Sequence, residues 1–339
     1  MNYTIVNEYL DYQEKYEKEY GKNTIVLMEV GSFYEIYGIE NKNMKKGKVR
    51  EISEILNIQI ARKSKNIAEI SYKNPYMAGF PSWAKDKYIP VLLKENYTII
   101  LVEQVTAPPK PKREVTRIIS PSTNIEYNNI NNDTTYTVCI YLDQNDNSTS
   151  LGISVIDITT GESIIYEISS LQHNDKMFVI NDLYRFLTIY SPTELVIYYT
   201  DKVELEKLYD KNCYYYNDLP KDILKLSYQN DILKKIFKNT GFLSPIEYLS
   251  LEKHQLGTIS FILNIDFIYK HDESILKKLK KPDYFKTNDK LILINNAIQQ
   301  LDILPKNNIN ATKINSLFGL LNNTSTCMGK RLLKQKLLN

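Results

Sequence analysis

The segment Gly31-Ser-Phe-Tyr-Glu-Ile-Tyr-Gly38 carries aromatic residues and a carboxylate at alternating positions. Side chains of an extended strand alternate between its two faces, so Phe33, Glu35 and Tyr37 share one face. An aromatic ring at an exposed strand end can wedge between stacked bases, while a neighbouring acid accepts a hydrogen bond from a base edge. An ordinary half-buried strand with an exposed glutamate gives the same pattern, so the segment alone leaves both interpretations open.

The acid restricts what such a wedge can bind. A carboxylate beside DNA phosphates is repelled unless it finds a hydrogen-bond donor or takes up a proton. A stacked base pair resists the wedge, whereas a mismatched or unpaired base has already lost part of its stacking. We therefore expect a wedge of this kind to select DNA by how easily the DNA deforms.

Positive charge is concentrated just after this segment. Residues 41–65 hold eight basic residues against Glu51 and Glu54, a local net charge of +6, whereas the whole chain carries +3. Phosphate contact and a merely solvated lysine-rich face both fit this cluster. We single out Arg62, Lys63 and Lys65, because they stand together in a loop-like Ala-Arg-Lys-Ser-Lys run. The other basic residues are Lys42, Lys45, Lys46, Lys48 and Arg50.

The sequence lacks the residue patterns of several kinds of catalytic site. Cys139, Cys213 and Cys327 lie far apart and form no C-x-x-C pair, and the three histidines have no metal-ligand spacing. No glycine begins a G-x-x-x-x-G-K-[ST] loop. We therefore expect no catalytic, metal-binding or cofactor-binding residues and no enzyme activity in this chain.

The apolar pattern predicts two α/β domains followed by an all-α domain. Residues 1–124 should form a mixed-sheet α/β domain, and residues 125–134, rich in Asn, a linker. This domain should contain helices over 7–20 and 85–96 and strands over 24–30 and 97–104. Residues 135–239 should form a small α/β domain with strands over 136–143, 152–158, 163–168 and 194–199 and helices over 176–189 and 202–209.

From residue 240 to 339, apolar residues recur at helical spacing and predict an all-α domain. The last helix, from Lys330, reaches Asn339 without a C-cap, which predicts that this domain is incomplete. Apolar runs fall short of the roughly 18 residues that span a bilayer, and the first residues lack a signal peptide's basic flank and apolar stretch. We expect an intracellular, cytoplasmic protein with no membrane contact.

Several segments resemble parts of one protein family and occur in the same order along the chain. The segment 31–37 is similar to the Phe-x-Glu motif of the MutS mismatch-recognition family, and 75–81, 102–105 and 112–117 are similar to its N-terminal domain. Residues 136–162 resemble its connector domain, a ribonuclease H-like fold, and 297–303, 315–318 and 327–333 resemble the start of its helical core (lever) domain. The Gly-Ser form of the first motif and the AT-rich composition favour the branch found in large DNA viruses and octocoral mitochondria.

This resemblance implies a role in DNA mismatch repair, with double-stranded DNA containing mismatches or unpaired bases as the partner. It implies that Phe33 is the wedge, Glu35 the base-reading acid, Val30 a backbone contact and Tyr34 a core residue. A full-length family member would be a dimeric, DNA-dependent ATPase that meets repair partners through its connector domain. The ATP and Mg²⁺ sites and the clamp would then lie in a missing C-terminal half, and a viral source would place the protein in the host cytoplasm.

Two alternatives stay open. The connector pattern could be a ribonuclease H-like, metal-dependent nuclease with Asp143 and Asp157 as metal-binding carboxylates, although Asp157 also opens a turn that favours Asp for backbone reasons. The connector and helical surfaces could instead form a protein-interaction scaffold that does not bind DNA. Preference for mismatched DNA, cleavage with Mg²⁺, or neither distinguishes the three.

Overall fold

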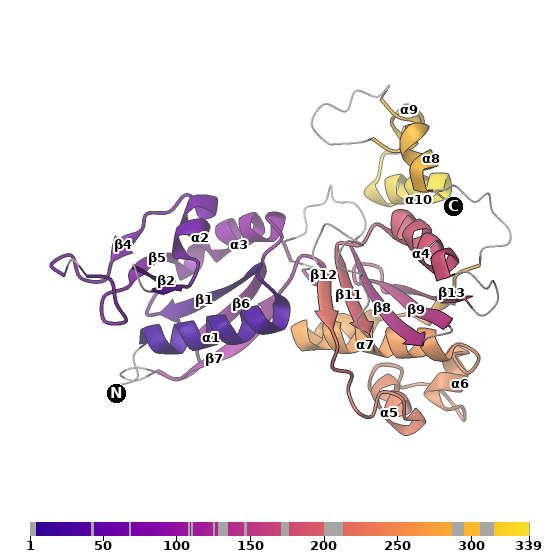
Figure 1. Cartoon of the computed structure of the whole chain (residues 1–339), viewed down its shortest axis with the longest axis horizontal. Helices are drawn as coiled ribbons and strands as arrows, with labels where there is room; N and C mark the ends of the chain where they lie inside the picture. The colour runs from indigo at the N-terminus through magenta and orange to yellow at the C-terminus, as the bar shows by residue number, and fades with distance from the viewer. Residues whose placement is uncertain are drawn as a thin grey trace. The chain divides into compact units, whose positions relative to one another are not determined.

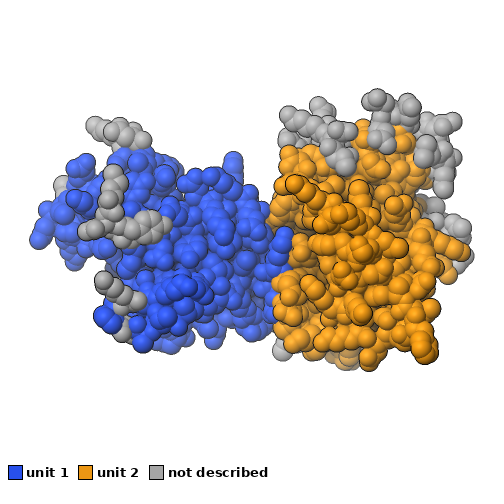
Figure 2. Space-filling model, turned by 90° about the horizontal axis from the view of Figure 1, so that it is seen from below, with its two compact units in different colours: residues 1–128, 270–272 blue, residues 129–269, 273–339 orange. Residues whose placement is uncertain are grey.

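The computed structural model describes residues 5–41, 44–67, 69–107, 109, 111–124, 126–127, 135–145, 148–170, 176–199, 213–286, 295–305 and 315–338. The chain divides into two compact units (Figure 2). Unit 1 comprises Met1–Asn128 and Lys270–Asp272, and unit 2 comprises Asn129–Tyr269 and Glu273–Asn339. Helices and strands keep the labels of Figure 1.

Unit 1 is built on a seven-stranded mixed sheet in the order β4-β5-β2-β1-β6-β7, with β3 also paired to β2. Only β1 and β6 run parallel among the described strand pairs of this sheet. The strands are β1 (Thr24–Val30), β2 (Phe33–Asn41), β3 (Met44–Lys46), β4 (Ala61–Arg62), β5 (Tyr76–Pro81), β6 (Thr98–Gln104) and β7 (Arg113–Ile119).

Helices cover both faces of this sheet (Figure 1). The β-branched run of β1 is buried on both faces, because α1 (Ile5–Tyr20) packs on one side and α2 (Val49–Leu56) and α3 (Lys85–Lys94) on the other. Tyr9 of α1 contacts Tyr37 with ring centres 5.4 Å apart, and Tyr88 of α3 contacts Phe80 at 4.4 Å. The predicted mixed-sheet α/β architecture is therefore confirmed for this unit.

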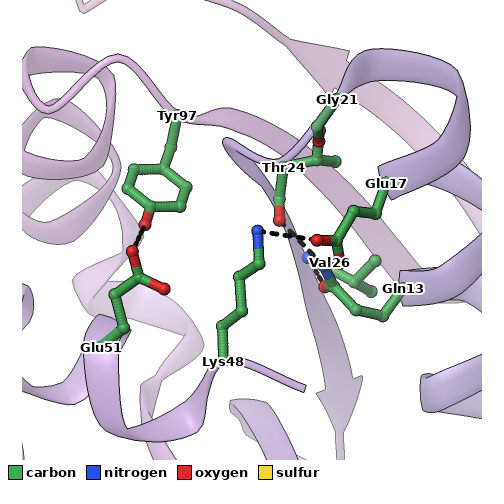
Figure 3. Close-up of polar contacts among 8 residues, drawn as sticks. All are labelled: Gln13, Glu17, Gly21, Thr24, Val26, Lys48, Glu51 and Tyr97. Carbon is green, nitrogen blue, oxygen red and sulfur yellow. Dashed lines mark hydrogen bonds and ion pairs between the residues drawn. The ribbon is translucent and has the colours of Figure 1, made fainter. Parts of the chain in front are cut away.

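A single buried amide attaches α1 to the beginning of β1. The Gln13 side chain donates to the Thr24 carbonyl at 2.8 Å and accepts from the Val26 N–H at 2.9 Å (Figure 3). Gln13 thus forms hydrogen bonds with two backbone groups at the beginning of β1, and these groups would otherwise be buried without partners. The polar sequence of α1 conceals this contact, because the other polar side chains of the helix face solvent or are only half-buried.

Unit 2 contains a six-stranded mixed sheet in the order β12-β11-β8-β9-β10-β13. The predicted antiparallel meander is present as β8, β9 and β10, and β11 lies parallel to β8. Helix α4 (Lys176–Tyr190) packs on one face through a cluster of aliphatic and aromatic side chains. The strands are β8 (Tyr136–Asn145), β9 (Ser148–Asp157), β10 (Glu162–Ser169), β11 (Glu194–Tyr199), β12 (Cys213–Tyr216) and β13 (Asp283–Tyr284).

The opposite face is covered by α7 (Gln255–His271), which apolar periodicity predicts to be part of a helical domain beginning at 240. Ser260 donates to the Cys139 carbonyl at 2.8 Å, and Asn264 donates to the Thr137 carbonyl at 3.1 Å. A Cβ at Gly152 would lie 2.0 Å from the Leu256 carbonyl oxygen, so glycine permits this close packing. Apolar periodicity reveals that a helix has a buried face but not what covers it.

The remaining described α-helices are α5 (Leu226–Ile236), α6 (Pro245–Leu249), α8 (Asn295–Gln300), α9 (Leu317–Leu321) and α10 (Cys327–Leu338), and a 3-10 helix, η3, spans Glu273–Lys278. The helix predicted over 202–209 lies outside the described residues. Within the described residues, the helices are too short or too polar to cross a membrane. The ribonuclease H-like connector and the incomplete helical core stay predictions.

Candidate nucleic-acid interface

The predicted wedge residue lies at the tip of a tight hairpin. Val30 pairs with Phe33, so only Gly31 and Ser32 connect β1 to β2. Gly31 has φ +62°, the left-handed conformation that the first central residue of a type II′ hairpin turn requires. Phe33 is 44% exposed beside this turn, and Val30 is half-buried across from it. Both residues are therefore placed where an external partner can reach them.

Two neighbouring segments hold the hairpin tip. Gln104, at the end of β6, donates through its side chain to the Gly31 carbonyl at 3.1 Å and through its backbone to Glu29 at 2.8 Å. On the other side, the Ser82 N–H donates to the Ser32 carbonyl at 2.8 Å. Sequence reasoning assigned no role to these bracing residues, although both occur in or next to the segments 75–81 and 102–105 that resemble the family.

The strand face shared by Phe33, Glu35 and Tyr37 is exposed to solvent only at the Phe33 end. Tyr37 is 2% exposed beneath Tyr9, Glu35 is half-buried, and Phe33 is exposed. Tyr34 points to the other face, is also 2% exposed and packs on Phe80 with ring centres 5.9 Å apart. The assignment of Tyr34 to the core is therefore confirmed.

Glu35 has a hydrogen-bond donor within its own strand. The Tyr37 hydroxyl donates to the Glu35 carboxylate, which lies two residues away on the same face. Burial raises the pKa of Tyr37, and the hydrogen bond to Glu35 raises it further, so this phenol stays protonated as a donor. One carboxylate lone pair is thus satisfied by the protein, while the half-exposed carboxylate keeps acceptor capacity for a base N–H.

Gly79 of β5 lies directly across from Glu35 in the antiparallel pair. A Cβ at this position would lie 2.6 Å from the Tyr34 carbonyl oxygen and 3.4 Å from Cγ of Glu35. The absence of a side chain therefore allows β2 and β5 to pair and leaves space beside the carboxylate. Gly79 lies in the segment 75–81 that resembles the family, but no role for it is evident from the sequence.

The basic residues of the segment 41–65 fall into two groups. The first group is paired with acids of unit 1: Lys45 and Arg50 with Glu40, Lys46 with Glu14, and Lys48 with Glu17. In the second group, Lys63 and Lys65 are exposed and make no ion pair with the described residues, and Arg62 donates only weakly, at 3.4 Å, to the Ile67 carbonyl. The three residues that we singled out are thus the more available for phosphates, and Lys42 lies outside the described residues.

A buried asparagine organises the loop that carries these three cations. The Asn74 side chain is fully buried, accepts from the Ser64 N–H at 2.7 Å and donates to the Ile67 and Glu69 carbonyls at 2.9 and 3.2 Å. The Lys63 N–H donates to the Pro75 carbonyl at 3.2 Å. The described residues of this loop are therefore held by internal hydrogen bonds, and its basic side chains project from a defined backbone.

The wedge and the basic loop are not brought together in one cluster. Along β5, Pro81 pairs with Phe33, whereas Tyr76 pairs with Arg62. Five residues of strand separate these two positions, about 17 Å at roughly 3.3 Å per residue. DNA advances about 3.4 Å per base, so one duplex contacting both would span about five base steps.

A cavity of about 550 Å³ lies elsewhere on unit 1, between α1, the β2–β3 hairpin and α2. Its cations are the paired group: Lys48, for example, lies 3.3 Å from Glu17 (Figure 3). Beside it, the Tyr97 hydroxyl donates to Glu51 at 2.5 Å. Because these cations are already paired with acidic side chains, the cavity is a poorer phosphate site than the exposed loop around Lys63.

The nuclease alternative is wrong for the residues that we named. Asp143 pairs with Ser150 near one end of the β8–β9 ladder, whereas Asp157 pairs with Tyr136 at the other end. Seven residues of strand separate them, about 23 Å, whereas paired catalytic metal ions lie about 4 Å apart. Asp157 is 3% exposed and accepts from the Thr159 N–H and hydroxyl, so it stabilises the turn.

Comparison with known proteins identifies the domain that carries this surface. Residues 7–128 match the family model of MutS domain I. The chain is similar to MutS proteins. The MutS domain I match covers the whole hairpin, the bracing residues and the basic loop, so the candidate interface lies within one recognised domain.

Relatives of MutS type match almost the whole chain. A mutS homolog of Acanthamoeba polyphaga mimivirus is 33% identical over 375 residues, covering 99% of this chain and 33% of that protein. The DNA mismatch repair protein MutS of Caldanaerobacter subterraneus is 28% identical over 341 residues, covering 98% and 35%. The mitochondrial mutS homolog of Sarcophyton glaucum is 27% identical over 390 residues, covering 96% and 37%. The chain thus spans about a third of the length of these MutS relatives.

Among solved structures, the fowlpox virus resolvase bound to Holliday junction DNA is similar with a TM-score of 0.24 and 14% identity, covering 39% of this chain and 97% of that chain.

Proposed function

We propose that unit 1 recognises mispaired or unpaired bases in double-stranded DNA, as part of DNA mismatch repair. Phe33 enters the weakened base stack, Glu35 accepts a hydrogen bond from a base edge, and Val30 packs at the backbone beside them. Arg62, Lys63 and Lys65 contact phosphates about five base steps away. The observation that carries this proposal is the exposed Phe33 on a braced two-residue hairpin, beside a carboxylate with its own internal donor.

In this proposal the chain binds and does not catalyse. The MutS relatives are about three times longer, and we propose that ATP hydrolysis with Mg²⁺, dimerisation and clamping of DNA belong to the longer protein. Repair partner proteins would meet residues 135–239 of unit 2, which we propose to be the connector. The described residues include no group of three or more His, Cys, Asp or Glu side chains placed to hold a metal ion.

The test is a pair of binding titrations with the 339-residue chain on matched duplex and on duplex with one unpaired thymine. Binding to both should weaken as salt rises, because phosphate contacts release counterions, and the unpaired site should bind more tightly. Phe33→Ala should remove this preference while leaving the salt slope unchanged, because the ring contacts bases and the cations contact phosphates.

A stability control separates the wedge from a packing role. Phe33 is 44% exposed, whereas Phe80 on the neighbouring strand is 1% exposed. Phe80→Ala should therefore lower the free energy of unfolding by about 3–5 kcal/mol, and Phe33→Ala by much less. Equal binding of both duplexes by the wild-type chain would refute mismatch recognition, and absence of binding at low salt would favour the protein-interaction scaffold.

A further inference from the structure

One large aromatic residue of unit 1 has no role in the interface described above. Trp83 is the only tryptophan of the chain, and it is 83% exposed. It lies in the 3-10 turn η1 (Ser82–Ala84), which connects β5 to α3. Tryptophan is usually well buried, because its ring carries a large apolar area that water solvates poorly. Single exposed aromatics also occur on ordinary surfaces, so the position of Trp83 has to decide its role.

The strand register places Trp83 at the same end of the sheet as Phe33. Phe33 pairs with Pro81, and the Ser82 N–H donates to the Ser32 carbonyl at 2.8 Å, so the pairing continues to the residue before Trp83. Paired Cα atoms lie about 5 Å apart, and two further residues add at most about 7 Å. The Cα atoms of Phe33 and Trp83 are therefore within about 12 Å, which is three to four base steps at about 3.4 Å each.

The backbone that carries Trp83 is ordered on both sides. The Lys85 N–H closes the turn onto the Ser82 carbonyl, and Ala84 is buried beneath it. The charges that follow suit a polyanion, because Lys85 and Lys87 stand on either side of Asp86, which accepts from the Tyr127 hydroxyl at 3.0 Å. A ring on a fixed turn can stack on a partner at a low cost in conformational entropy.

We propose that Trp83 is a second aromatic contact with DNA and packs against a nucleoside within three to four base steps of the step that Phe33 enters. The inference rests on the proposed function, because it requires Phe33 to be at the DNA. Every base offers an apolar face, so stacking on the indole ring tolerates sequence. A base displaced by the wedge exposes a face that a stacked base does not, so the contact favours the disrupted site.

The single tryptophan makes the experiment possible without a label. Excitation at the red edge of protein absorption, where tyrosine does not absorb, reports Trp83 alone. Adding duplex with one unpaired thymine should quench and shift this emission and should protect the ring from acrylamide. Matched duplex, at a concentration that gives equal occupancy, should protect it less.

Three variants complete the test, with binding measured by anisotropy of labelled DNA. Trp83→Ala should weaken binding to the unpaired site by about 10-fold, and Trp83→Phe by less, because a smaller ring still stacks. Phe242→Ala removes a fully exposed aromatic of unit 2 and should bind as the wild type does. All variants should keep the wild-type thermal midpoint.

The outcomes separate the two proposals. If Phe33→Ala loses mismatch preference while Trp83→Ala binds as the wild type does and acrylamide quenching is unchanged at saturating DNA, the function stands and the Trp83 contact is refuted. If the wild-type chain binds neither duplex, the proposed function fails and the Trp83 contact fails with it. Trp83 would then be assigned to a protein partner.

Discussion

Replacing Gly79 with alanine should disturb the recognition strand β2 from the neighbouring strand β5 without replacing any of the proposed DNA-contacting residues. The new methyl group would begin 2.6 Å from the Tyr34 carbonyl oxygen, and ordinary contact needs at least 3.4 Å. That oxygen belongs to the backbone of a central strand, so β2 and β5 must separate. Overpacking of this kind costs about 1–3 kcal/mol, and the stiffer unfolded chain returns about 0.4–1 kcal/mol. We expect a net loss of about 1–2 kcal/mol in the free energy of unfolding.

The variant should also lose part of its preference for an unpaired thymine, because Glu35 lies on the displaced strand, 3.4 Å from the added methyl group. Urea unfolding gives the stability, and competition binding gives the preference. Gly21→Ala is the matched control: its φ of +81° makes alanine strained by about 1 kcal/mol, but the site is open and lies between α1 and β1. If Gly79→Ala keeps both wild-type stability and wild-type preference, the proposed role of this close contact is wrong.

Three further predictions address charge. Glu35→Gln should tighten binding to matched DNA and reduce discrimination in competition assays, because it removes a negative charge near phosphates; unchanged discrimination would contradict the base-reading role. Replacing both Lys63 and Lys65 by alanine should make the slope of log affinity against log salt less negative by about 1.8. Lys45→Ala should barely change this slope because Lys45 is already ion-paired. The pKa of the Tyr37 hydroxyl is 10.0 in the unfolded chain and is higher in the folded chain, so the folded chain holds this proton more tightly. Stability should therefore fall above about pH 10, and urea unfolding of Tyr37→Phe should show a shallower fall.

The strands with long apolar, β-branched runs could be predicted in both units because turn residues bound these runs, whereas β3, β4, β5, β7, β12 and β13 were not predicted. Strands β1 and β11 begin and end where the sequence predicts, and α1, α3 and α4 lie within two residues of their predicted ends. The placement of α7 could not be predicted. Its contacts with the sheet, through Ser260 and Asn264, join residues more than 100 positions apart, and a periodic pattern contains no information on such pairings.

In the candidate site, too, local features could be predicted from the sequence and contacts between distant segments could not. The alternation around Phe33 correctly separates Tyr34 from the wedge face, because strand geometry determines it. The donor of Glu35 was not predictable, because Tyr37 is turned inward by α1, which comes from another part of the chain. The division of the basic residues was also hidden, since the acids that neutralise Lys46 and Lys48 belong to α1. Net charge counted along the sequence therefore overstated the number of cations available to DNA.

The two-residue hairpin has a consequence for how selectivity arises. A ring on a turn that is anchored by Gln104 on one side and Ser82 on the other has little conformational freedom left to lose on binding. The ordering of the protein is completed during folding and is the same for every DNA that the chain meets. Differences in affinity between DNA sites must then originate in the DNA, and their ranking should follow the ease with which each site unstacks and bends.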